Sequence, residues 1–282
     1  MTATGTTLVI GATGTTGSRT AAQLIAAGHR VKAASRHATA VPGAEPARFD
    51  WYDPATHLGA LDGVDRVYLI PPVGDSDPAA VMLPFLQRAR TAGVHRAVLL
   101  SSSAIPEGGP AVGTVHQALR GLFEQWAVLR PSWFMQNFTG AHIHAQSIRA
   151  DGTIWTATGS GRAGFVDAED IAAVAVHALT DDHAPDTDLV LTGPEALSYD
   201  DIARSITDVT GRPVVHHQLS YQQMRDRLTK LIPLEFAAML AGMDRAIAEG
   251  SEDRVTDTVQ RLTGRPPRSF RAVVEREMSW SS

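Results

Sequence analysis

Hydrophobic positions in the first half of the chain form short runs separated by stretches with helical spacing. The run Leu8-Val9-Ile10 predicts a buried strand, and apolar residues three to four positions apart predict a helix over residues 18–27. Similar spacing predicts a helix beginning near Pro78 and another over residues 115–125. Further apolar runs predict strands over residues 31–34, 47–49, 64–70, 97–100 and 127–129. Strands that alternate with helices indicate an α/β, Rossmann-like, doubly wound parallel sheet.

The second half of the chain is less regular. Short apolar runs predict strands at residues 154–157 and 165–166, around a glycine-rich loop, and helical spacing predicts a helix over residues 170–179. From about Pro194 onward the pattern is mainly helical. We therefore expect residues 1–193 to form a dinucleotide-binding domain, with residues 194–282 as a small helical substrate lobe packed on it in one compact unit.

The strongest local motif is the turn that follows the first predicted strand. Its glycines Gly11, Gly14 and Gly17 fall in the spacing G-x-x-G-x-x-G, directly after a strand and at the start of a helix. Such a turn brings bare backbone and a helix N-terminus against a pyrophosphate group. An ordinary glycine-rich turn is the alternative, but the strand before it and the helix after it favour dinucleotide binding.

The end of the second predicted strand bears on the choice of cofactor. Enzymes that use NAD usually place an acidic residue here, which holds the ribose 2′-hydroxyl. This chain has Ser35 and Arg36 instead, and both can bind a 2′-phosphate. The sequence therefore favours NADPH over NADH, with a solvated surface role for Arg36 as the alternative.

The next strand ends also carry candidate cofactor contacts. Asp50 could accept a hydrogen bond from the adenine amine and Trp51 could cover the ring, although a structural turn with a packed aromatic residue explains both equally well. Segments Ile70-Pro71-Pro72 and Ser101-Ser102-Ser103 end the strands expected to face the ribose and nicotinamide. The serines could equally cap the end of their strand.

Composition and charge exclude several classes of protein. The formal net charge of −5 gives no support to nucleic-acid binding, and the absence of cysteine excludes disulfides, thiol catalysis and cysteine-based metal sites. The eleven histidines show no metal-binding spacing, so we predict no metal. No signal peptide and no apolar run of about 20 residues are visible, so we expect a soluble cytoplasmic protein with no membrane partner.

Several segments together resemble a known family. They are the turn over residues 9–17, Ser35-Arg36, the segment Val98–Ser103 and, most specifically, Leu129-Arg130-Pro131-Ser132-Trp133-Phe134-Met135-Gln136-Asn137-Phe138. The later segments 164–172, 192–195 and 263–270 continue the likeness. The chain resembles the NmrA-like branch of atypical short-chain dehydrogenases, and within it the ergot-alkaloid group, which includes festuclavine and agroclavine dehydrogenases, and its bacterial relatives.

The resemblance implies where cofactor and substrate bind. It implies NADPH held by the glycine-rich turn, with Arg36 on the 2′-phosphate and Pro131-Ser132-Trp133 beside the nicotinamide. It implies a substrate pocket walled by the C-terminal helices and by aromatic and amide side chains, although such a cluster could equally be core. The turn residues are Gly11, Thr13, Gly14, Thr15, Thr16 and Gly17; the pocket residues are Trp133, Phe134, Asn137 and Phe165.

The chain lacks the usual catalytic pair of short-chain dehydrogenases, a tyrosine with a lysine four residues later. The positions four residues after its four tyrosines hold Thr56, Pro72, Ala203 and Arg225. Ketone reduction needs a proton donor, which typically contributes about 10²–10⁴-fold in rate. An iminium ion is already cationic and accepts hydride without one, so catalysis reduces largely to orientation in a dry pocket. The missing pair therefore favours reduction of an imine or iminium.

Three residues are candidates if the reaction does need an acid. They are His116, Asp167 and Ser102. His116 could instead lie on the polar surface of a helix, and Asp167 could instead cap the helix that begins near Ala168. The sequence leaves these alternatives open.

Three functions fit these observations. The first is NADPH-dependent reduction of a small organic substrate carrying an imine, iminium or activated C=C or C=O group, in secondary metabolism. The second is a non-catalytic NADP(H)-sensing regulator, and the third is a cyclase or isomerase that leaves the cofactor unchanged. The oligomeric state is left open, with a homodimer as one candidate.

Overall fold

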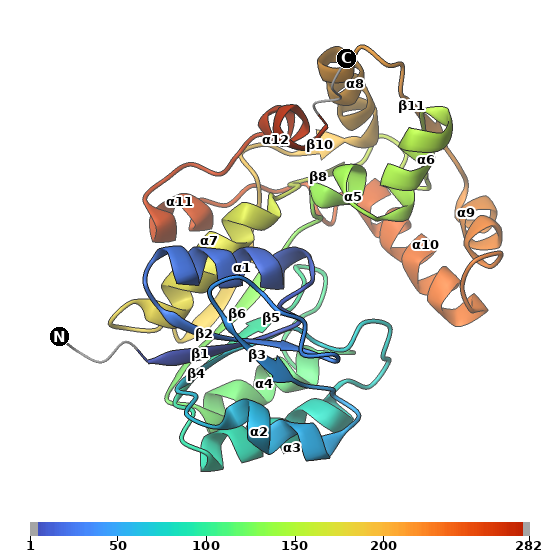
Figure 1. Ribbon diagram of the computed structural model, residues 1–282. Coiled ribbons are helices and arrows are strands. Elements are labelled where there is room, and N and C mark those ends of the chain that lie inside the picture. Colours follow the sequence, from blue (N-terminus) through green and yellow to red (C-terminus); the bar gives the residue numbers. More distant parts are fainter. Residues whose placement is uncertain (1–4, 279–282) are drawn as a thin grey trace. The chain divides into compact units, whose positions relative to one another are not determined.

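A computed structural model describes residues 5–278 of the chain (Figure 1). These residues divide into two compact units, and each is built from more than one segment. Unit 1 comprises the residues up to Pro131 together with Ala168–Leu191 and Thr258–Gly264, and unit 2 comprises Ser132–Asp167, Thr192–Asp257 and the residues from Arg265 onward. This division differs from the expected boundary between residues 193 and 194, because residues 132–167 fold with the C-terminal helices and not with the sheet.

Unit 1 is built around a parallel sheet of seven strands in the order β3-β2-β1-β4-β5-β6-β9, which confirms the predicted doubly wound fold. Helices α1, α7 and α11 cover one face, and α2, α3 and α4 cover the other (Figure 1). The strands are β1 (Thr6–Ile10), β2 (Arg30–Ser35), β3 (Glu45–Arg48), β4 (Arg66–Leu69), β5 (Arg96–Leu100), β6 (Gln125–Pro131) and β9 (Thr187–Leu191). The helices are α1 (Thr15–Ala26), α2 (His57–Leu61), α3 (Ala79–Thr91), α4 (Gly113–Leu122), α7 (Ala168–Thr180) and α11 (Thr258–Thr263), with a 3₁₀ turn at Pro54–Thr56.

The central strands have almost no exposed side chains, since helices bury both faces of the sheet. This is why their sequences are continuous apolar runs rather than alternating patterns. The strand order reverses between β1 and β4, which are neighbours in the sheet although two strands and two helices separate them in the sequence. Ligands of such sheets bind beyond the carboxyl ends of the strands at this reversal.

One predicted helix extends too far. Helical spacing indicated a helix to residue 125, whereas α4 ends at Leu122 and β6 begins at Gln125. Phe123 adopts an extended backbone, with φ −126° and ψ 139°, and Gln125 then pairs with Arg96 of β5. Because Phe123 is apolar and buried, it continues the hydrophobic spacing although the helix has already ended.

Unit 2 is mainly helical, in agreement with the pattern of the C-terminal region. Its helices enclose an aromatic core in which Phe138 and Phe165 meet Tyr199 edge to face. The helices are α5 (Gln136–Thr139), α6 (Ile143–Asp151), α8 (Tyr199–Thr210), α9 (Tyr221–Leu228), α10 (Leu234–Ala248) and α12 (Phe270–Glu277). Two small sheets join β7 (Thr153–Thr156) to β11 (Val215–Gln218) and β8 (Arg162–Ala163) to β10 (Leu197–Ser198).

Candidate functional site

The glycine-rich turn forms a cradle of bare backbone at the carboxyl end of β1. Gly11 has a φ of +69°, which disfavours a residue with a Cβ atom. A Cβ atom on Gly17 would lie 2.1 Å from the carbonyl oxygen of Gly11, so α1 can approach the turn this closely only with glycine at that position. The glycines therefore have the steric role that the motif predicts.

The N-terminus of α1 is open to a ligand. No side chain caps the helix, and its first turn contains no acidic residue. Thr13, Gly14 and Thr15 are exposed, whereas Thr16 and Gly17 are buried against the sheet. Unpaired N–H groups and the helix dipole attract anions to such an end. The cradle thus fits the pyrophosphate of a dinucleotide.

The end of β2 presents a basic side chain to solvent. Arg36 is exposed, and within residues 5–278 no carboxylate pairs with its guanidinium. The neighbouring Ser35 hydroxyl accepts a hydrogen bond from the backbone N–H of Thr39 at 2.8 Å, which stabilises the turn that follows. Because β2 pairs with β1 along its length, this end lies beside the glycine-rich turn. The position suits an anionic group next to a bound dinucleotide.

Of the two residues proposed to contact adenine, Trp51 belongs to the core. Its ring packs edge to face on Phe49 and Phe85, its exposed fraction is 8%, and its indole N–H donates to the Ile70 carbonyl at 3.0 Å. These contacts favour the structural alternative, in which Trp51 braces the end of β4. Asp50 is partly exposed, and one of its carboxylate oxygens accepts the N–H of Tyr52.

The carboxyl ends of β4 and β5, across the point where the strand order reverses, are held in place by neighbouring residues. Ile70 packs against the open face of Gly11, and Pro71 and Pro72 are partly exposed beyond it. The N–H of Ser101 donates to the Leu129 carbonyl at 2.7 Å, so β5 stays paired with β6 up to its end. The Ser101 hydroxyl is shielded from solvent and has no hydrogen-bond partner among residues 5–278.

Arg130 contributes to this edge although its sequence position did not indicate a role. Its guanidinium donates to the carbonyl oxygens of Ser102 and Ser103 at 3.4 and 3.0 Å, and pairs with Asp188 at 2.6 Å. These contacts tie the carboxyl ends of β5 and β6 to the neighbouring strand β9. The pairing depends on a strand that lies 58 residues further along the chain, so spacing within the motif could not reveal it.

The remaining predicted cofactor and substrate contacts, apart from Pro131 at the end of β6, lie in unit 2. Ser132 is buried and its hydroxyl donates to Glu252 at 3.2 Å. Trp133, Phe134 and Asn137 are each partly exposed, and Trp133 packs against the unit 2 core. The ring of Phe165 is fully buried in that core, with 1% of its surface exposed. Phe165 therefore packs inside the core of unit 2 and does not present its ring to a ligand.

The three candidate acids occupy different surroundings. His116 is buried beside Trp126, not on the helix surface as the alternative expected, and burial lowers its pKa so that the ring is neutral at pH 7. Ser102 is partly exposed, and its hydroxyl accepts the N–H of Ala104. None of these contacts would activate His116 or Ser102 as a proton donor.

Asp167 is held in a buried ion pair. Its carboxylate accepts two hydrogen bonds from Arg276 at 2.9 and 3.0 Å and one from Gln136 at 2.8 Å, and Arg268 lies 3.7 Å away. The side chain is completely buried, and the pair raises the pKa of Arg276 above its usual range. Arginine and glutamine that donate to both oxygens hold this carboxylate ionised, so the contacts describe a structural anchor between α5 and α12.

A further buried carboxyl, Asp244 of α10, was not apparent in the sequence. It accepts the backbone N–H of Ala157 at 2.8 Å, and burial raises its pKa from its ordinary value near 4 to about 6. The only sign of its burial in the sequence is its position in a largely apolar helix, and an aspartate in a helix is more often on the surface.

The raised pKa of Asp244 predicts a specific dependence of stability on pH. The folded state holds this proton up to about pH 6 and the unfolded state only to about pH 4, so stability falls as pH rises through this window. We compare the free energy of unfolding of Asp244→Asn with that of the unchanged protein. We expect the difference to shift in favour of the variant by about 2–3 kcal/mol when the pH is raised from about 4 to about 8. Chemical denaturation of both proteins at the two pH values measures this difference. A constant difference would contradict the assignment.

No three histidine, aspartate or glutamate side chains gather closely enough to hold a metal ion within residues 5–278. None of the helices described here has the length and hydrophobicity required to span a membrane.

Several known proteins are similar to this chain over most of its length and most of their own. Residues 11–182 match the family described as NAD(P)H-binding, and residues 114–265 match the NmrA-like family. An uncharacterized oxidoreductase of Bacillus subtilis, YesF, is 46% identical over 264 residues, covering 93% of this chain and 92% of the relative. Festuclavine synthase II of Penicillium roqueforti is 37% identical, covering 96% of this chain and 98% of its own length.

Solved structures share the fold. The NADPH-dependent quinone oxidoreductase QOR2 of Escherichia coli, solved with NADPH, superposes with a TM-score of 0.80 at 22% identity. The alignment covers 97% of this chain and all of that chain. The likeness at this level of identity concerns the fold alone.

Proposed function

Because this chain belongs to the NmrA-like family and carries its NAD(P)H-binding domain, we propose that it transfers hydride from NADPH to a small organic substrate. It is an NAD(P)H-dependent oxidoreductase. The observation that carries the proposal is the cradle at Gly11–Gly17, which leaves bare backbone and an open helix N-terminus at the point where the strand order reverses.

The preference for NADPH rests on the end of β2. Arg36 places an exposed guanidinium beside the glycine-rich turn, and no acidic residue follows β2 to hold a ribose 2′-hydroxyl. A guanidinium binds a phosphate through two parallel charge-assisted hydrogen bonds, and a partly exposed Ser35 can add a third. When bound here, NADPH would supply a hydride from its nicotinamide ring.

The surroundings of the candidate acids bear on the class of substrate. The chain has no Tyr-x-x-x-Lys pair, His116 is a buried neutral ring, and Asp167 is held by arginines. A substrate that is already cationic at the carbon–nitrogen double bond needs no proton from the protein. Its carbon gains hydride while the π electrons become the nitrogen lone pair. We therefore propose an imine or iminium first, and an activated C=C or C=O group second.

Unit 2 supplies side chains suited to such a substrate. Trp133 and Phe134 are partly exposed, and their backbone is fixed by hydrogen bonds between Trp133, Met135 and Val166. An aromatic face attracts a cation as well as apolar surface. We propose that Trp133, Phe134 and Asn137 contact the substrate, and that Ser132 stands beside the nicotinamide. Relatives named for festuclavine and agroclavine suggest an iminium of secondary metabolism whose reduction gives a clavine-like amine.

The cofactor proposal predicts a selective effect of Arg36→Ala. We expect the affinity for NADPH to fall about 10- to 100-fold, because charge-assisted hydrogen bonds contribute about 1.5–3 kcal/mol, while NADH binding stays unchanged. Fluorescence titration with each nucleotide measures both affinities. Arg30→Ala is the matched control, since Arg30 is an exposed arginine at the opposite end of the same strand. Equal losses for NADPH and NADH, or none, would disprove the role of Arg36.

A further inference from the structure

The loop over residues 249–257, which follows α10, is fastened to other segments of unit 2. The backbone N–H of Thr256 donates to the Thr192 hydroxyl at 2.9 Å. A Cβ atom on Gly164 would lie 2.5 Å from the carbonyl oxygen of Arg254, so the loop packs against bare backbone there. The cofactor and substrate proposals give this loop no role, although it is held at several points.

The same loop contains a buried carboxylate, that of Glu252, which is 4% exposed. The Arg254 guanidinium lies 3.4 and 3.5 Å from its two oxygens, and the Ser132 hydroxyl donates to one of them at 3.2 Å. A buried charge needs a partner of opposite sign, and Arg254 supplies one from within the loop. The contact with Ser132 is different, because it joins the loop to a segment 120 residues earlier in the chain.

Ser132 opens the segment that carries the proposed substrate contacts. It directly follows β6, and Trp133 and Phe134, both partly exposed, come next. The backbone here is also held by Val166, whose N–H donates to the Trp133 carbonyl at 2.9 Å and whose carbonyl accepts the Met135 N–H at 3.0 Å. Trp133 therefore lies between two attachments, one at Ser132 and one at Val166.

The attachment at Ser132 is a hydrogen bond from a hydroxyl to a carboxylate. Such a bond with an ionised partner is stronger than one between neutral groups, and burial strengthens it further. A misplacement of about 1 Å in a group that orients a substrate can lower the rate about a hundredfold. A carboxylate that fixes Ser132 can therefore affect catalysis without touching the substrate.

We propose that Glu252 is a positioning residue, which fixes Trp133 and Phe134 against the substrate by accepting the Ser132 hydroxyl. The inference rests on the proposed function for the contact between these side chains and a substrate. It also predicts that the surroundings of Trp133 depend on Glu252 in the protein alone, and this part is measured without substrate or nucleotide.

Two substitutions of Glu252 separate hydrogen bonding from charge. Glu252→Gln and Glu252→Met both lose the charge that faces Arg254, but only glutamine keeps an oxygen that can accept the Ser132 hydroxyl. The full chain is labelled with fluorotryptophan, and the fluorine NMR signals are assigned with Trp133→Phe and Trp155→Phe. We expect Glu252→Met to shift or broaden the Trp133 signal and Glu252→Gln to restore it. The signal of Trp155, which belongs to the same unit, should not move.

The kinetic consequence is measured with N-methylpyrrolinium, a cyclic iminium, at saturating NADPH. We expect Glu252→Met to lower kcat roughly tenfold or more, because misplaced contacts orient the substrate poorly, with a smaller change in KM. Its affinity for NADPH in a fluorescence titration should stay unchanged, since the cradle belongs to unit 1. Ser132→Ala removes the same bond without changing a charge and should lower kcat likewise, but should add little in the Glu252→Met background.

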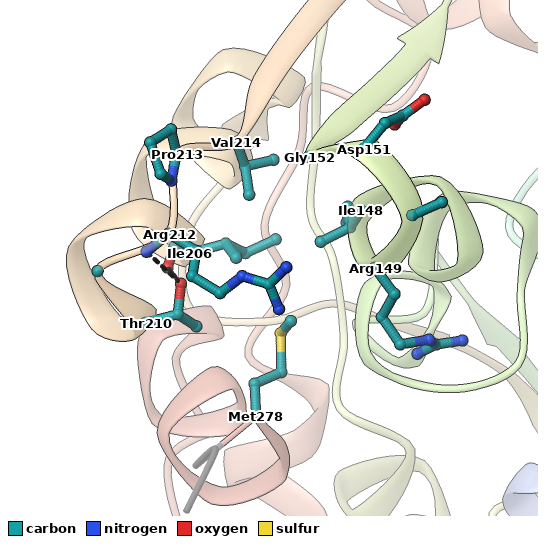
Figure 2. Close-up of a pocket in the computed structure, with 12 residues that line it drawn as sticks. Ile148, Arg149, Asp151, Gly152, Ile206, Thr210, Arg212, Pro213, Val214 and Met278 are labelled. Carbon is teal, nitrogen blue, oxygen red and sulfur yellow. Dashed lines mark hydrogen bonds between the residues drawn. The ribbon is translucent and has the colours of Figure 1, made fainter. Parts of the chain in front are cut away.

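Asp151→Asn is the matched control, because Asp151 is another carboxylate of unit 2 that accepts a serine hydroxyl, that of Ser147. Figure 2 shows Asp151 beside a cavity of about 270 Å³, and the residues that line this cavity include none from the loop 249–257 or the segment 132–134. This variant should leave the Trp133 signal and kcat as they are in the unchanged protein.

An unchanged Trp133 signal in Glu252→Met would overturn the inference, and so would equal effects of Glu252→Met and Glu252→Gln. A shifted Trp133 signal with unchanged kcat would overturn the part that concerns the substrate. A failure of the unchanged protein to consume NADPH would contradict the proposed function instead, and the Trp133 signal would still decide whether Glu252 positions this segment.

Discussion

Replacing Gly17 with alanine is expected to weaken the binding of NADP(H) severely. The new Cβ atom would lie 2.1 Å from the Gly11 carbonyl oxygen and 3.2 Å from the Ala12 Cα atom, and backbone cannot yield as a flexible side chain does. Helix α1 must therefore shift away from the turn, which removes its N-terminus from the pyrophosphate. We expect a loss of affinity on the order of a hundredfold or more, and a loss of stability of about 1–3 kcal/mol.

Gly121→Ala is the matched control for this experiment. Gly121 lies in α4 of the same unit, and a Cβ atom there would meet nothing within 4 Å. Alanine favours a helix over glycine by up to about 1 kcal/mol, so this variant should be as stable as the unchanged protein or more so, with unchanged affinity. Nucleotide titration and thermal unfolding of both variants give the comparison. Normal NADPH affinity in Gly17→Ala would show that the turn does not hold the cofactor.

Replacing Asp167 with asparagine is expected to destabilise the protein by about 3 kcal/mol. The change removes the charge of a completely buried carboxylate that accepts two hydrogen bonds from Arg276, and removing one partner of a buried pair typically costs about 3–5 kcal/mol. We place the effect at the low end because the Arg276 side chain is 37% exposed. Denaturant unfolding measures the change.

The same variant separates a structural role for Asp167 from a catalytic one. A proton donor replaced by asparagine would lower kcat in a protein of normal stability, whereas an anchor lowers stability and leaves the pH profile of kcat unchanged. Glu275→Gln, which breaks the exposed pair with Arg271 on the same helix, should change stability by less than about 1 kcal/mol. A stable Asp167→Asn protein whose kcat is lowered and no longer falls as pH rises would restore the catalytic assignment.

The features that sequence predicted well are local ones. The cradle at Gly11–Gly17 depends on steric needs that only glycine meets, and the parallel sheet follows from strands buried on both faces, so both were visible as patterns. The capping box of α8 is equally local, because the Ser198 hydroxyl accepts the backbone N–H of Asp201 and the Asp201 carboxylate accepts the backbone N–H of Ser198.

The features that sequence could not place depend on contacts distant along the chain. The position of Asp167 before α7 matches the pattern of a helix cap, and that pattern does not reveal its ion pair with Arg276, 109 residues away. His116 fitted an amphipathic helix face, yet Trp126 and the sheet bury it. The arginine that fastens the strand ends, Arg130, depends on Asp188 in β9. Segment 132–167 joined unit 2 because its aromatic side chains pack with Tyr199 and Phe270, which no local pattern records.

The most direct test of the central claim follows the hydride itself. The purified protein is incubated with a cyclic iminium substrate and NADPH deuterated at the transferable position of the nicotinamide, and the product is analysed by mass spectrometry. We predict one deuterium in the product, at the carbon of the former C=N bond, with one NADPH consumed per product. Conversion of substrate without label would indicate a cyclase or isomerase, and tight NADPH binding with no consumption across imines, enals and quinones would indicate a sensor; either result would contradict the reductase account.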